Sequence, residues 1–361
     1  MKKKIVILLC TILTAISTYV VSAEDNTPKF PTFDIQPAYS DVVVDTVKLD
    51  LMDDKRELRM NIYKPEGHDE PTPVVIWVHG GKWCEGDYSN ERQVKGLVEN
   101  GNFLSCMSTL DLGCTVVTAD YRLSQEALYP AMVWDLKGQI RFLRANAEKY
   151  NIDPDRIIVW GESAGGHLVN LLGTTDGIEE LEGDVGGNLE YSSKPTAVID
   201  YFGMTDILEL APDQYERPYI ISAKDMYDQV DAAESTRSQL LGFNGEGEGI
   251  GVLRANLGNP GNPYENPDSP YQDALHRAYL SCPLNFVTKD DCPFFISQGG
   301  QDYRVAVNQS VRLFEELTKS GVEAYMFADT LKGHGTQGSF ADDAAFRFIC
   351  DQFNIESNKG L

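Results

Sequence analysis

The segment GESAG at 161–165 places Ser163 between small residues, directly after the apolar run 157–160 and before the helical pattern 167–172. A sharp turn from strand to helix presents such a serine as a nucleophile, and its glycines allow the tight turn and the close approach of a substrate. The N-terminus of the following helix favours the negative charge that develops during attack on a carbonyl group. We therefore predict that Ser163 is a nucleophile. The alternative is a tight turn without a chemical role.

A serine hydroxyl is a weak nucleophile unless a base removes its proton, so this interpretation requires a histidine. Of the five histidines, His334 lies in a glycine-flanked loop after the expected strand 323–328. Asp302 follows the expected strand 293–297, which gives the chain order nucleophile, acid, base. We predict a catalytic triad in which Asp302 orients His334 and His334 activates Ser163. Other aspartates remain alternatives to Asp302, namely Asp290, Asp291 and Asp329.

Several other polar residues near these motifs receive a structural interpretation. His276 lies in a polar helical stretch and is expected on the surface, and His167, on the helix after Ser163, is expected at a packing or solvent position. For Arg122 we expect a buried ion pair with Asp135 rather than a part in the chemistry.

A glycine pair, Gly80 and Gly81, follows another apolar run. Backbone N–H groups exposed there, together with the N–H of Ala164, are predicted to form an oxyanion hole for a tetrahedral intermediate. The alternative is an ordinary glycine loop. Lys82 and Trp83 come next and are candidates for substrate binding, although Trp83 is as well explained by packing.

Elements that would position these residues alternate along the chain. Short, nearly continuous apolar runs are typical of strands buried on both faces, and they occur at 74–78, 115–119, 157–160, 197–199, 294–296 and 324–327. Before them, the period-two segments 42–49 and 58–63 predict an antiparallel start. Helical patterns occur at 130–147 and 307–317. The alternation predicts an α/β fold with a mostly parallel sheet covered by helices on both faces.

The segment 242–270 breaks the alternation because it is dense in glycine and proline. A long irregular segment inside a domain is usually an active-site lid or binding loop, or else a disordered insertion. We expect a loop-rich lid insertion within about 206–290, with 242–270 as the lid. Its acidic residues lack the ligand spacing of a known calcium loop, so we expect no metal there.

The N-terminus has the features of a secretory signal peptide. Three lysines at 2–4 precede an apolar run at 5–21, and small residues lead to Ala23. We expect cleavage after Ala23, export to the periplasm or the medium, no stable membrane anchor, and a single domain at 24–361. An uncleaved membrane anchor is the alternative, but the run is short of the about 20 apolar residues that a spanning helix needs.

Export would allow disulfides, but the sequence does not rank the pairings of the six cysteines beyond the leader: Cys84, Cys106, Cys114, Cys282, Cys292 and Cys350. Their spacing is not that of a zinc site. The net charge of −24 disfavours nucleic acid and anionic membranes as partners. We expect no cofactor and no metal, and make no prediction of the oligomeric state.

Five motifs together resemble one family of enzymes. They are HGGKW at 79–83, DYRL at 120–123, YP at 129–130, DPDRI at 153–157 and GESAGG at 161–166. The chain resembles the hormone-sensitive-lipase-like esterases from about Leu58 to His334, and within them the bacterial subgroup related to feruloyl esterases. The resemblance implies an α/β-hydrolase fold with about eight strands, the triad Ser163, Asp302 and His334, and oxyanion glycines at 80 and 81.

This chain departs from the family's pattern at two places. Lys82 replaces a third glycine common in the family's loop, and 242–270 has no counterpart that can be placed. Both lie where acyl or alcohol groups would bind. The resemblance therefore predicts the reaction but does not identify the substrate.

These observations predict a secreted serine carboxylesterase that acts on short acyl or aromatic acyl esters, with esters on plant polysaccharides as candidate substrates. A small molecule or a polysaccharide-linked ester would be its partner. One alternative is a serine peptidase of the same fold, but the roughly 50 residues before the first strands are too few for the large N-terminal domain such peptidases typically carry. The other is a non-catalytic binding module, which would usually lack a member of the triad.

Overall fold

The computed structural model describes residues 36–89, 106–215, 229–258, 263–335 and 338–356. The predicted signal peptide at 1–23 lies outside these residues. Within the described ranges, no helix is both long and apolar enough to cross a membrane.

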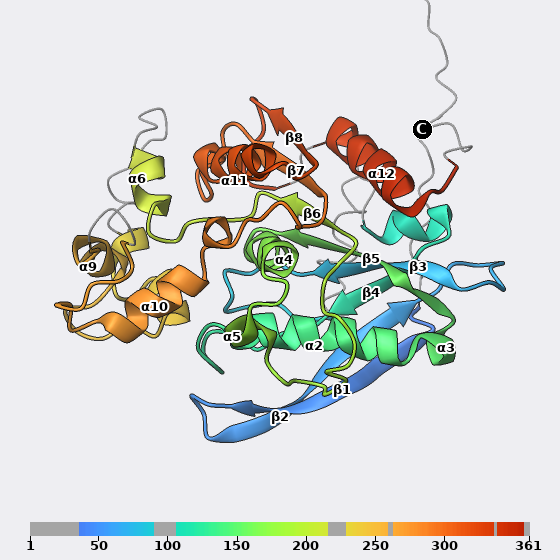
Figure 1. The fold of residues 1–361 in the computed structure, drawn as a ribbon, viewed down its shortest axis with the longest axis horizontal. Helices are drawn as coiled ribbons and strands as arrows, with labels where there is room; N and C mark the ends of the chain where they lie inside the picture. The colour runs from blue at the N-terminus through green and yellow to red at the C-terminus, as the bar shows by residue number, and fades with distance from the viewer. Residues whose placement is uncertain (1–35, 90–105, 216–228, 259–262, 336–337, 357–361) are drawn as a thin grey trace, which may run out of the picture. The chain divides into compact units, whose positions relative to one another are not determined.

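Eight strands form one sheet in the order β1-β2-β4-β3-β5-β6-β7-β8 (Figure 1). Their bounds are β1 Tyr39–Leu49, β2 Asp54–Tyr63, β3 Thr72–Val78, β4 Thr115–Ala119, β5 Ile152–Glu162, β6 Ala197–Tyr201, β7 Phe294–Gly299 and β8 Ala324–Asp329. β2 is antiparallel to both β1 and β4, and every other pairing is parallel. The predicted α/β fold, with its antiparallel start and mostly parallel sheet, is confirmed.

The strand register brings the carboxyl ends of the parallel strands to one edge of the sheet. Val78 of β3 pairs with Gly161 of β5, and Tyr201 of β6 pairs with Ser297 of β7. Loops that follow these strands therefore start close together, which is where open α/β sheets bind ligands.

The helices of the fold lie between the strands or after the last one. Their bounds are η1 Cys106–Leu112, α2 Ala131–Ala145, α3 Ala147–Tyr150, α4 Ala164–Thr174, α5 Glu179–Glu182, α6 Leu210–Tyr215, α8 Thr236–Leu240, α9 Ile250–Ala255, α10 Gln272–Leu280, η2 Pro283–Asn285, α11 Val307–Ser320 and α12 Ser339–Phe353. Gly321 ends α11 in a left-handed conformation, as its place after the helical pattern suggests.

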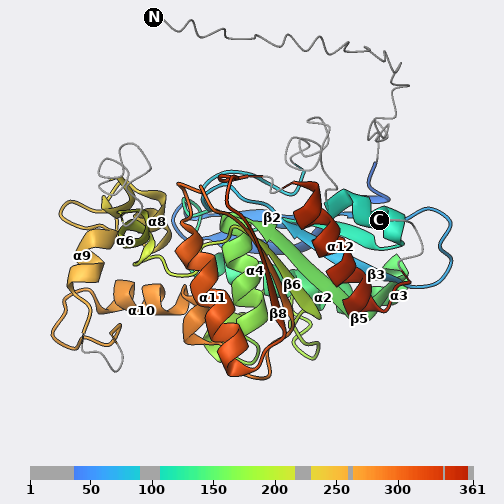
Figure 2. The same ribbon diagram turned by 90° about the horizontal axis from the view of Figure 1, so that it is seen from above.

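The sheet separates two layers of helices (Figure 2), and both faces of the sheet are covered because side chains along a strand alternate between them. α4 covers one face, where a Cβ at Gly173 would meet both Val198 and Phe294. On the other face, the ring of Trp160 packs against Phe346 of α12. α4, which begins directly after Ser163, therefore rests on β6 and β7.

β8 differs from the sequence prediction. Its apolar run predicted a strand buried on both faces, as β3, β4, β6 and β7 are. β8 instead lies at one edge of the sheet, and Tyr325 is 53% exposed. The prediction was wrong because an apolar run does not reveal whether a strand has neighbours on both sides.

The insertion between β6 and β7 carries α6, α8, α9 and α10. The prediction of a loop throughout 242–270 was wrong at α9, although most of its described residues are turns and loops. Ile250 and Leu253 are fully buried, and their contacts with the core stabilise a helical turn in this glycine-dense stretch.

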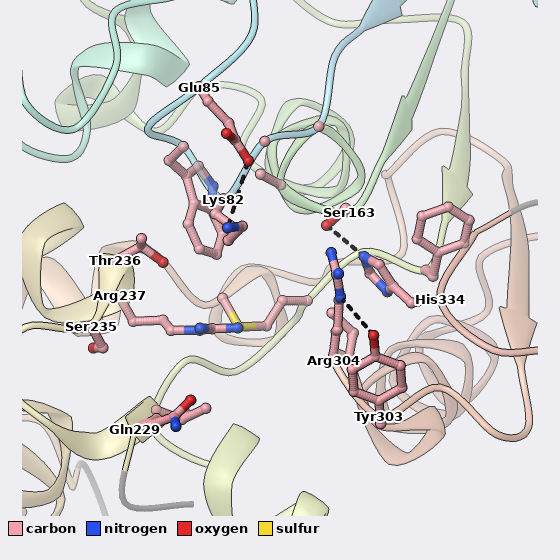
Figure 3. A pocket seen from close by; sticks show the side chains of 18 of the residues that line it. Lys82, Glu85, Ser163, Gln229, Ser235, Thr236, Arg237, Tyr303, Arg304 and His334 are labelled. Atoms are coloured by element: carbon pink, nitrogen blue, oxygen red, sulfur yellow. Dashed lines mark hydrogen bonds and ion pairs between the residues drawn. The ribbon is translucent and has the colours of Figure 1, made fainter. Parts of the chain in front are cut away.

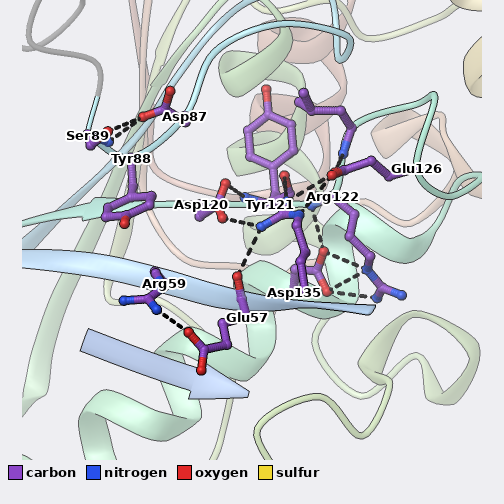
Figure 4. Close-up of polar contacts among 12 residues, drawn as sticks. Glu57, Arg59, Asp87, Tyr88, Ser89, Asp120, Tyr121, Arg122, Glu126 and Asp135 are labelled. Atoms are coloured by element: carbon purple, nitrogen blue, oxygen red, sulfur yellow. Dashed lines mark hydrogen bonds and ion pairs between the residues drawn. The ribbon is translucent and has the colours of Figure 1, made fainter. Parts of the chain in front are cut away.

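A network of polar side chains joins the end of β4 to α2 (Figure 4). The Arg122 guanidinium donates to both carboxylate oxygens of Asp135, and its Nη2 lies 2.7 Å from Oδ1. The buried ion pair predicted for Arg122 is confirmed. The hydroxyl of buried Tyr121 donates to the carbonyl oxygen of His79 at 3.0 Å, so the network also supports the loop after β3.

The six described cysteines are free thiols in the structure, so it shows none of the disulfide pairings left open by the sequence.

Candidate active site

Ser163 lies between β5 and α4 in a strained backbone conformation, with φ 55° and ψ −115°. Its N–H donates to the carbonyl oxygen of Tyr201 on β6 at 2.9 Å. Glycines allow the turn to pack closely: a Cβ at Gly161 would lie 2.3 Å from the oxygen of Gly165, and a Cβ at Gly165 would lie 2.1 Å from the oxygen of Val78. The packing of β3, β5 and β6 thus fixes the turn, and Ser163 lines a cavity.

His334 lies in the loop after β8, and its imidazole joins Ser163 to Asp302 (Figure 3). Nε2 of His334 is 3.0 Å from Ser163 Oγ, and Nδ1 is 2.7 Å from Asp302 Oδ2. A carboxylate oxygen can only accept, so Nδ1 carries a proton and Nε2 of the neutral ring is free to accept one from the hydroxyl. The ring of Phe202 meets the imidazole edge-on, with centroids 4.7 Å apart.

Asp302 is fully buried, and its carboxylate accepts four hydrogen bonds. Oδ1 accepts from the backbone N–H groups of Arg304 at 2.8 Å and Val305 at 2.9 Å. Oδ2 accepts from His334 and from Nε2 of Gln298, the latter at 3.1 Å. These donors satisfy a buried charge and fix the carboxylate that faces the imidazole.

The alternative acids bond elsewhere. Asp291 accepts from Thr288, Asp329 accepts from the N–H of Leu331, and Asp290 pairs with Lys289. Of the four aspartates considered, only Asp302 hydrogen-bonds to His334 in the structure.

The loop after β3 passes directly beside Ser163. A Cβ at Gly80 would lie 3.0 Å from the oxygen of Glu162 and 3.4 Å from Cβ of Ser163, and Gly81 has a φ of +118°. Among the described residues, no backbone carbonyl accepts from the N–H of Gly80, Gly81 or Ala164. The three predicted donors therefore lie along the same cavity wall as Ser163 with their N–H groups unused.

His79 supports this loop, a role that the sequence did not indicate. Its ring stacks on Tyr121 with centroids 4.2 Å apart, and its Nδ1 donates to the carbonyl oxygen of Gly80 at 2.7 Å. Burial lowers the pKa of His79 to about 4, so the ring is neutral at neutral pH. Because C=O and N–H point in opposite directions across a trans peptide, this bond turns the N–H of Gly81 away from His79.

Trp83 is a buried packing residue that also lines the cavity. Its side chain is 3% exposed, and its indole N–H donates to Nδ1 of His167 at 3.2 Å. Nε2 of His167 donates to the oxygen of Ser281 at 2.7 Å, and burial lowers the pKa of His167 to about 4. His167 is therefore a packing residue. His276 lies on the surface beside Glu180, as predicted.

The cavity in front of Ser163 has a volume of about 780 Å³. Its walls come from the loop after β3, the turn at 162–164, the segment 303–305 and the insertion, which supplies residue 214 and residues between 229 and 237. None of the described residues of 242–270 lines it. The predicted lid was thus placed in the wrong part of the insertion. Lys82 lines the cavity and lies 3.6 Å from the carboxylate of Glu85.

Glu162 precedes Ser163 and also lines the cavity. Burial raises the pKa of its carboxyl group from 4.5 to about 7, because a carboxylate loses hydration there. Neither its burial nor its perturbed pKa could be read from the motif, since both depend on the glycine loop packed against it.

Glu162→Gln is expected to change the pH dependence of stability. The unfolded chain releases this proton near pH 4.5 and the native protein near pH 7, so the free energy of unfolding falls as pH rises between these values. Glutamine cannot ionise. The variant should match the parent near pH 4.5 and be more stable by up to about 3 kcal/mol above pH 7.5.

Thermal unfolding of Glu162→Gln, the parent and Glu85→Gln across pH 4.5 to 8 checks this expectation. Glu85 lines the same cavity with a side chain that is 64% exposed, so its variant should follow the parent. A difference between Glu162→Gln and the parent that does not change with pH would contradict the account of Glu162.

Sequence reasoning missed Phe202 and Gln298, which contact His334 and Asp302. Phe202 directly follows β6 and Gln298 lies near the end of β7. Their places at the carboxyl ends of parallel strands were the signal that could have identified them.

Comparison with known families gives a match to the BD-FAE family over residues 60–244. The chain belongs to the BD-FAE family of α/β-hydrolase esterases. The family model of the prolyl oligopeptidase family matches residues 260–354. The esterase resemblance predicted from the motifs is confirmed at the level of this fold and family.

Similar proteins include several named esterases. An arylesterase of Saccharolobus solfataricus is 36% identical over 113 residues, which cover 31% of this chain and 33% of that protein. The chain spans about a third of the length of the first curated relatives that it matches.

Solved structures match over most of this chain. A truncated carbohydrate esterase from gut microbiota has a TM-score of 0.65 and 25% identity, and the match covers 89% of this chain and 97% of that one. A bifunctional GH43-CE protein of Bacteroides eggerthii has the same score and identity, over 87% of this chain and 38% of its own.

Proposed function

We propose that this protein is a serine carboxylesterase. The observation that carries the proposal is the continuous pair of hydrogen bonds from Ser163 through His334 to buried Asp302, at 3.0 Å and 2.7 Å. A neutral imidazole that accepts from a serine and donates to a fixed carboxylate is the arrangement that activates a serine nucleophile.

In the first half of the reaction, Ser163 Oγ attacks the ester carbonyl carbon while Nε2 of His334 takes the hydroxyl proton. The oxyanion that forms is stabilised by the N–H groups of Gly80, Gly81 and Ala164. The C–O bond to the alcohol then breaks, and His334 gives its proton to the departing alkoxide.

Water completes the cycle. His334 removes a proton from a water molecule that attacks the acyl group on Ser163, and the resulting intermediate collapses with return of the proton to Ser163 Oγ. The products are the free acid and the alcohol, and Asp302 stays ionised because it orients the imidazole without taking its proton.

The proposed substrates are short-chain or aromatic acyl esters, including those attached to polysaccharides. A cavity of about 780 Å³ accommodates such groups. The likeness to a protein named as a carbohydrate esterase supports the polysaccharide context by analogy. We also propose export, with cleavage after Ala23, on the basis of the N-terminal sequence.

A serine peptidase is the second candidate, because the prolyl oligopeptidase family model matches 260–354, the part of the chain that holds Asp302 and His334. Both activities use the same triad chemistry, so the choice depends on which acyl derivatives the cavity accepts.

A substrate panel separates these candidates. The panel comprises 4-nitrophenyl acetate and butyrate, methyl ferulate, acetylated xylan and an aminoacyl 4-nitroanilide, each tested with the parent and Ser163→Ala. The proposal predicts Ser163-dependent release of acid from esters and little from the anilide. Faster turnover of the anilide than of every ester would favour the peptidase.

A further inference from the structure

Arg237 reaches from α8 into the cavity that Ser163 also lines (Figure 3). Its Nε is buried and has no hydrogen-bond partner. Among the described residues, no carboxylate forms an ion pair with Arg237. An unpaired, desolvated guanidinium is costly in free energy. Its presence in a cavity therefore indicates a site where a ligand can supply the missing partner.

Most of the other described arginines have acceptors. Six that are buried or partly buried pair with carboxylates, and they are Arg56, Arg122, Arg141, Arg156, Arg254 and Arg312. Two more, Arg144 and Arg277, donate to backbone carbonyl oxygens. Arg237 therefore differs from these arginines, because its Nε has no acceptor.

A second guanidinium lies nearby. Arg304 lines the cavity beside Ser163 and His334 (Figure 3), and its place is fixed because its N–H donates to Asp302. Its guanidinium contacts only a neutral partner in the described structure, the ring and hydroxyl of Tyr303, with Nε 3.4 Å from the hydroxyl oxygen.

The two cations influence each other. Burial lowers the pKa of Arg237 to about 10, and the positive charge of Arg304 acts in the same direction. A pKa of about 10 keeps Arg237 charged at neutral pH, inside a chain whose net charge is −24. An anion bound between them would relieve both the desolvation and the repulsion.

The acidic residues of the cavity do not supply that anion. Glu85 lies 3.6 Å from the ammonium of Lys82. Burial raises the pKa of Glu162 to about 7, which favours its neutral form. Glu234 is exposed. Among the described residues, the positive charges of Arg237 and Arg304 are thus left for a ligand.

We propose that Arg237 and Arg304 bind a carboxylate of the substrate, at a position remote from the ester bond that is cleaved. Preferred substrates are then acidic esters, which carry a free carboxylate in the acyl part, as in a monoester of a dicarboxylic acid, or in the alcohol part, as in an acylated uronic acid. A planar guanidinium suits this task because it donates two parallel hydrogen bonds to a carboxylate. The proposal rests on the proposed esterase activity of the same cavity.

The test compares an acidic and a neutral ester of similar shape on the same enzyme preparation. In the acyl arm these are 4-nitrophenyl hydrogen glutarate and 4-nitrophenyl pentanoate. In the alcohol arm they are the acetyl esters of a methyl glucuronide and a methyl glucoside. The measured quantity in each arm is the ratio of kcat/KM for the acidic ester to that for the neutral one.

In at least one arm, Arg237→Met should lower this ratio by about 10- to 100-fold, the size expected for hydrogen bonds to a charged group, and Arg237→Lys should restore part of it. Arg347→Met, which removes the same charge from an exposed site on α12, should keep the parent ratio. The arm that responds identifies the part of the substrate that carries the carboxylate. If Arg237→Met keeps the parent ratio in both arms, the proposal is wrong.

Binding of glutarate separates this proposal from the esterase proposal. If the parent hydrolyses none of these esters and a fluorophosphonate does not label Ser163, the proposed function has failed, and calorimetric titration with glutarate then decides about the carboxylate site. A Kd at least 10-fold weaker for Arg237→Met than for Arg347→Met would support the site, and equal values would overturn it. Arg237→Met should not lower Tm, because no described group loses a partner.

Discussion

Replacing Ser163 by alanine is expected to lower kcat for ester hydrolysis by about 10⁶-fold, the loss measured when the nucleophile of a comparable triad is removed. Alanine keeps the Cβ and removes only Oγ, the atom 3.0 Å from Nε2 of His334. The backbone strain at φ 55° is the same for both residues, so stability should change little. Initial rates on 4-nitrophenyl acetate and thermal unfolding check both parts.

Ser320→Ala is the matched control for that variant, because it removes a hydroxyl from the end of α11, outside the cavity lining. It should keep the activity of the parent. If Ser163→Ala retained more than a tenth of the parent's rate, the assignment of the nucleophile would be wrong.

Asp302→Asn is expected to lower kcat by about 10⁴-fold. The N–H groups of Arg304 and Val305 require an oxygen at the Oδ1 position, so the new amide nitrogen would take the Oδ2 position beside the imidazole. An amide N–H there needs an acceptor, which favours the His334 tautomer with a proton on Nε2. That tautomer cannot take the proton of Ser163.

Asp329→Asn tests the alternative acid considered from the sequence. Asp329 accepts from the N–H of Leu331 and does not contact His334, so its variant should keep most of the parent's kcat. Similar losses for Asp302→Asn and Asp329→Asn would contradict the assigned role of Asp302.

Local patterns were enough to predict the strands, the turn at Ser163 and the position of His334. Apolar runs mark buried strands, and a glycine-flanked serine between strand and helix has few other physical explanations. Asp302 was harder to predict, because the order of residues along the chain does not give the distance between their side chains. In the structure, Oδ2 of Asp302 lies 2.7 Å from Nδ1 of His334 in another loop. Asp329 has no such contact with His334, and this difference identifies Asp302 as the acid.

Features that depend on tertiary packing could not be predicted. The glycine and proline density at 242–270 indicated loop, but it did not reveal that 229–237 rather than 242–270 would face Ser163. The raised pKa of Glu162 and the unpaired guanidinium of Arg237 arise from neighbours that are distant in sequence. The exposed face of β8 likewise depends on its place at the edge of the sheet.

The central claim is that His334 activates Ser163 for attack on a substrate in the cavity. Incubation with a fluorophosphonate, followed by intact-mass and peptide mass spectrometry, tests it directly. The account predicts one adduct per chain on the peptide that contains Ser163, its absence in Ser163→Ala and much slower labelling of His334→Ala. An unlabelled parent protein, or an adduct on another residue that persists in Ser163→Ala, would contradict the account.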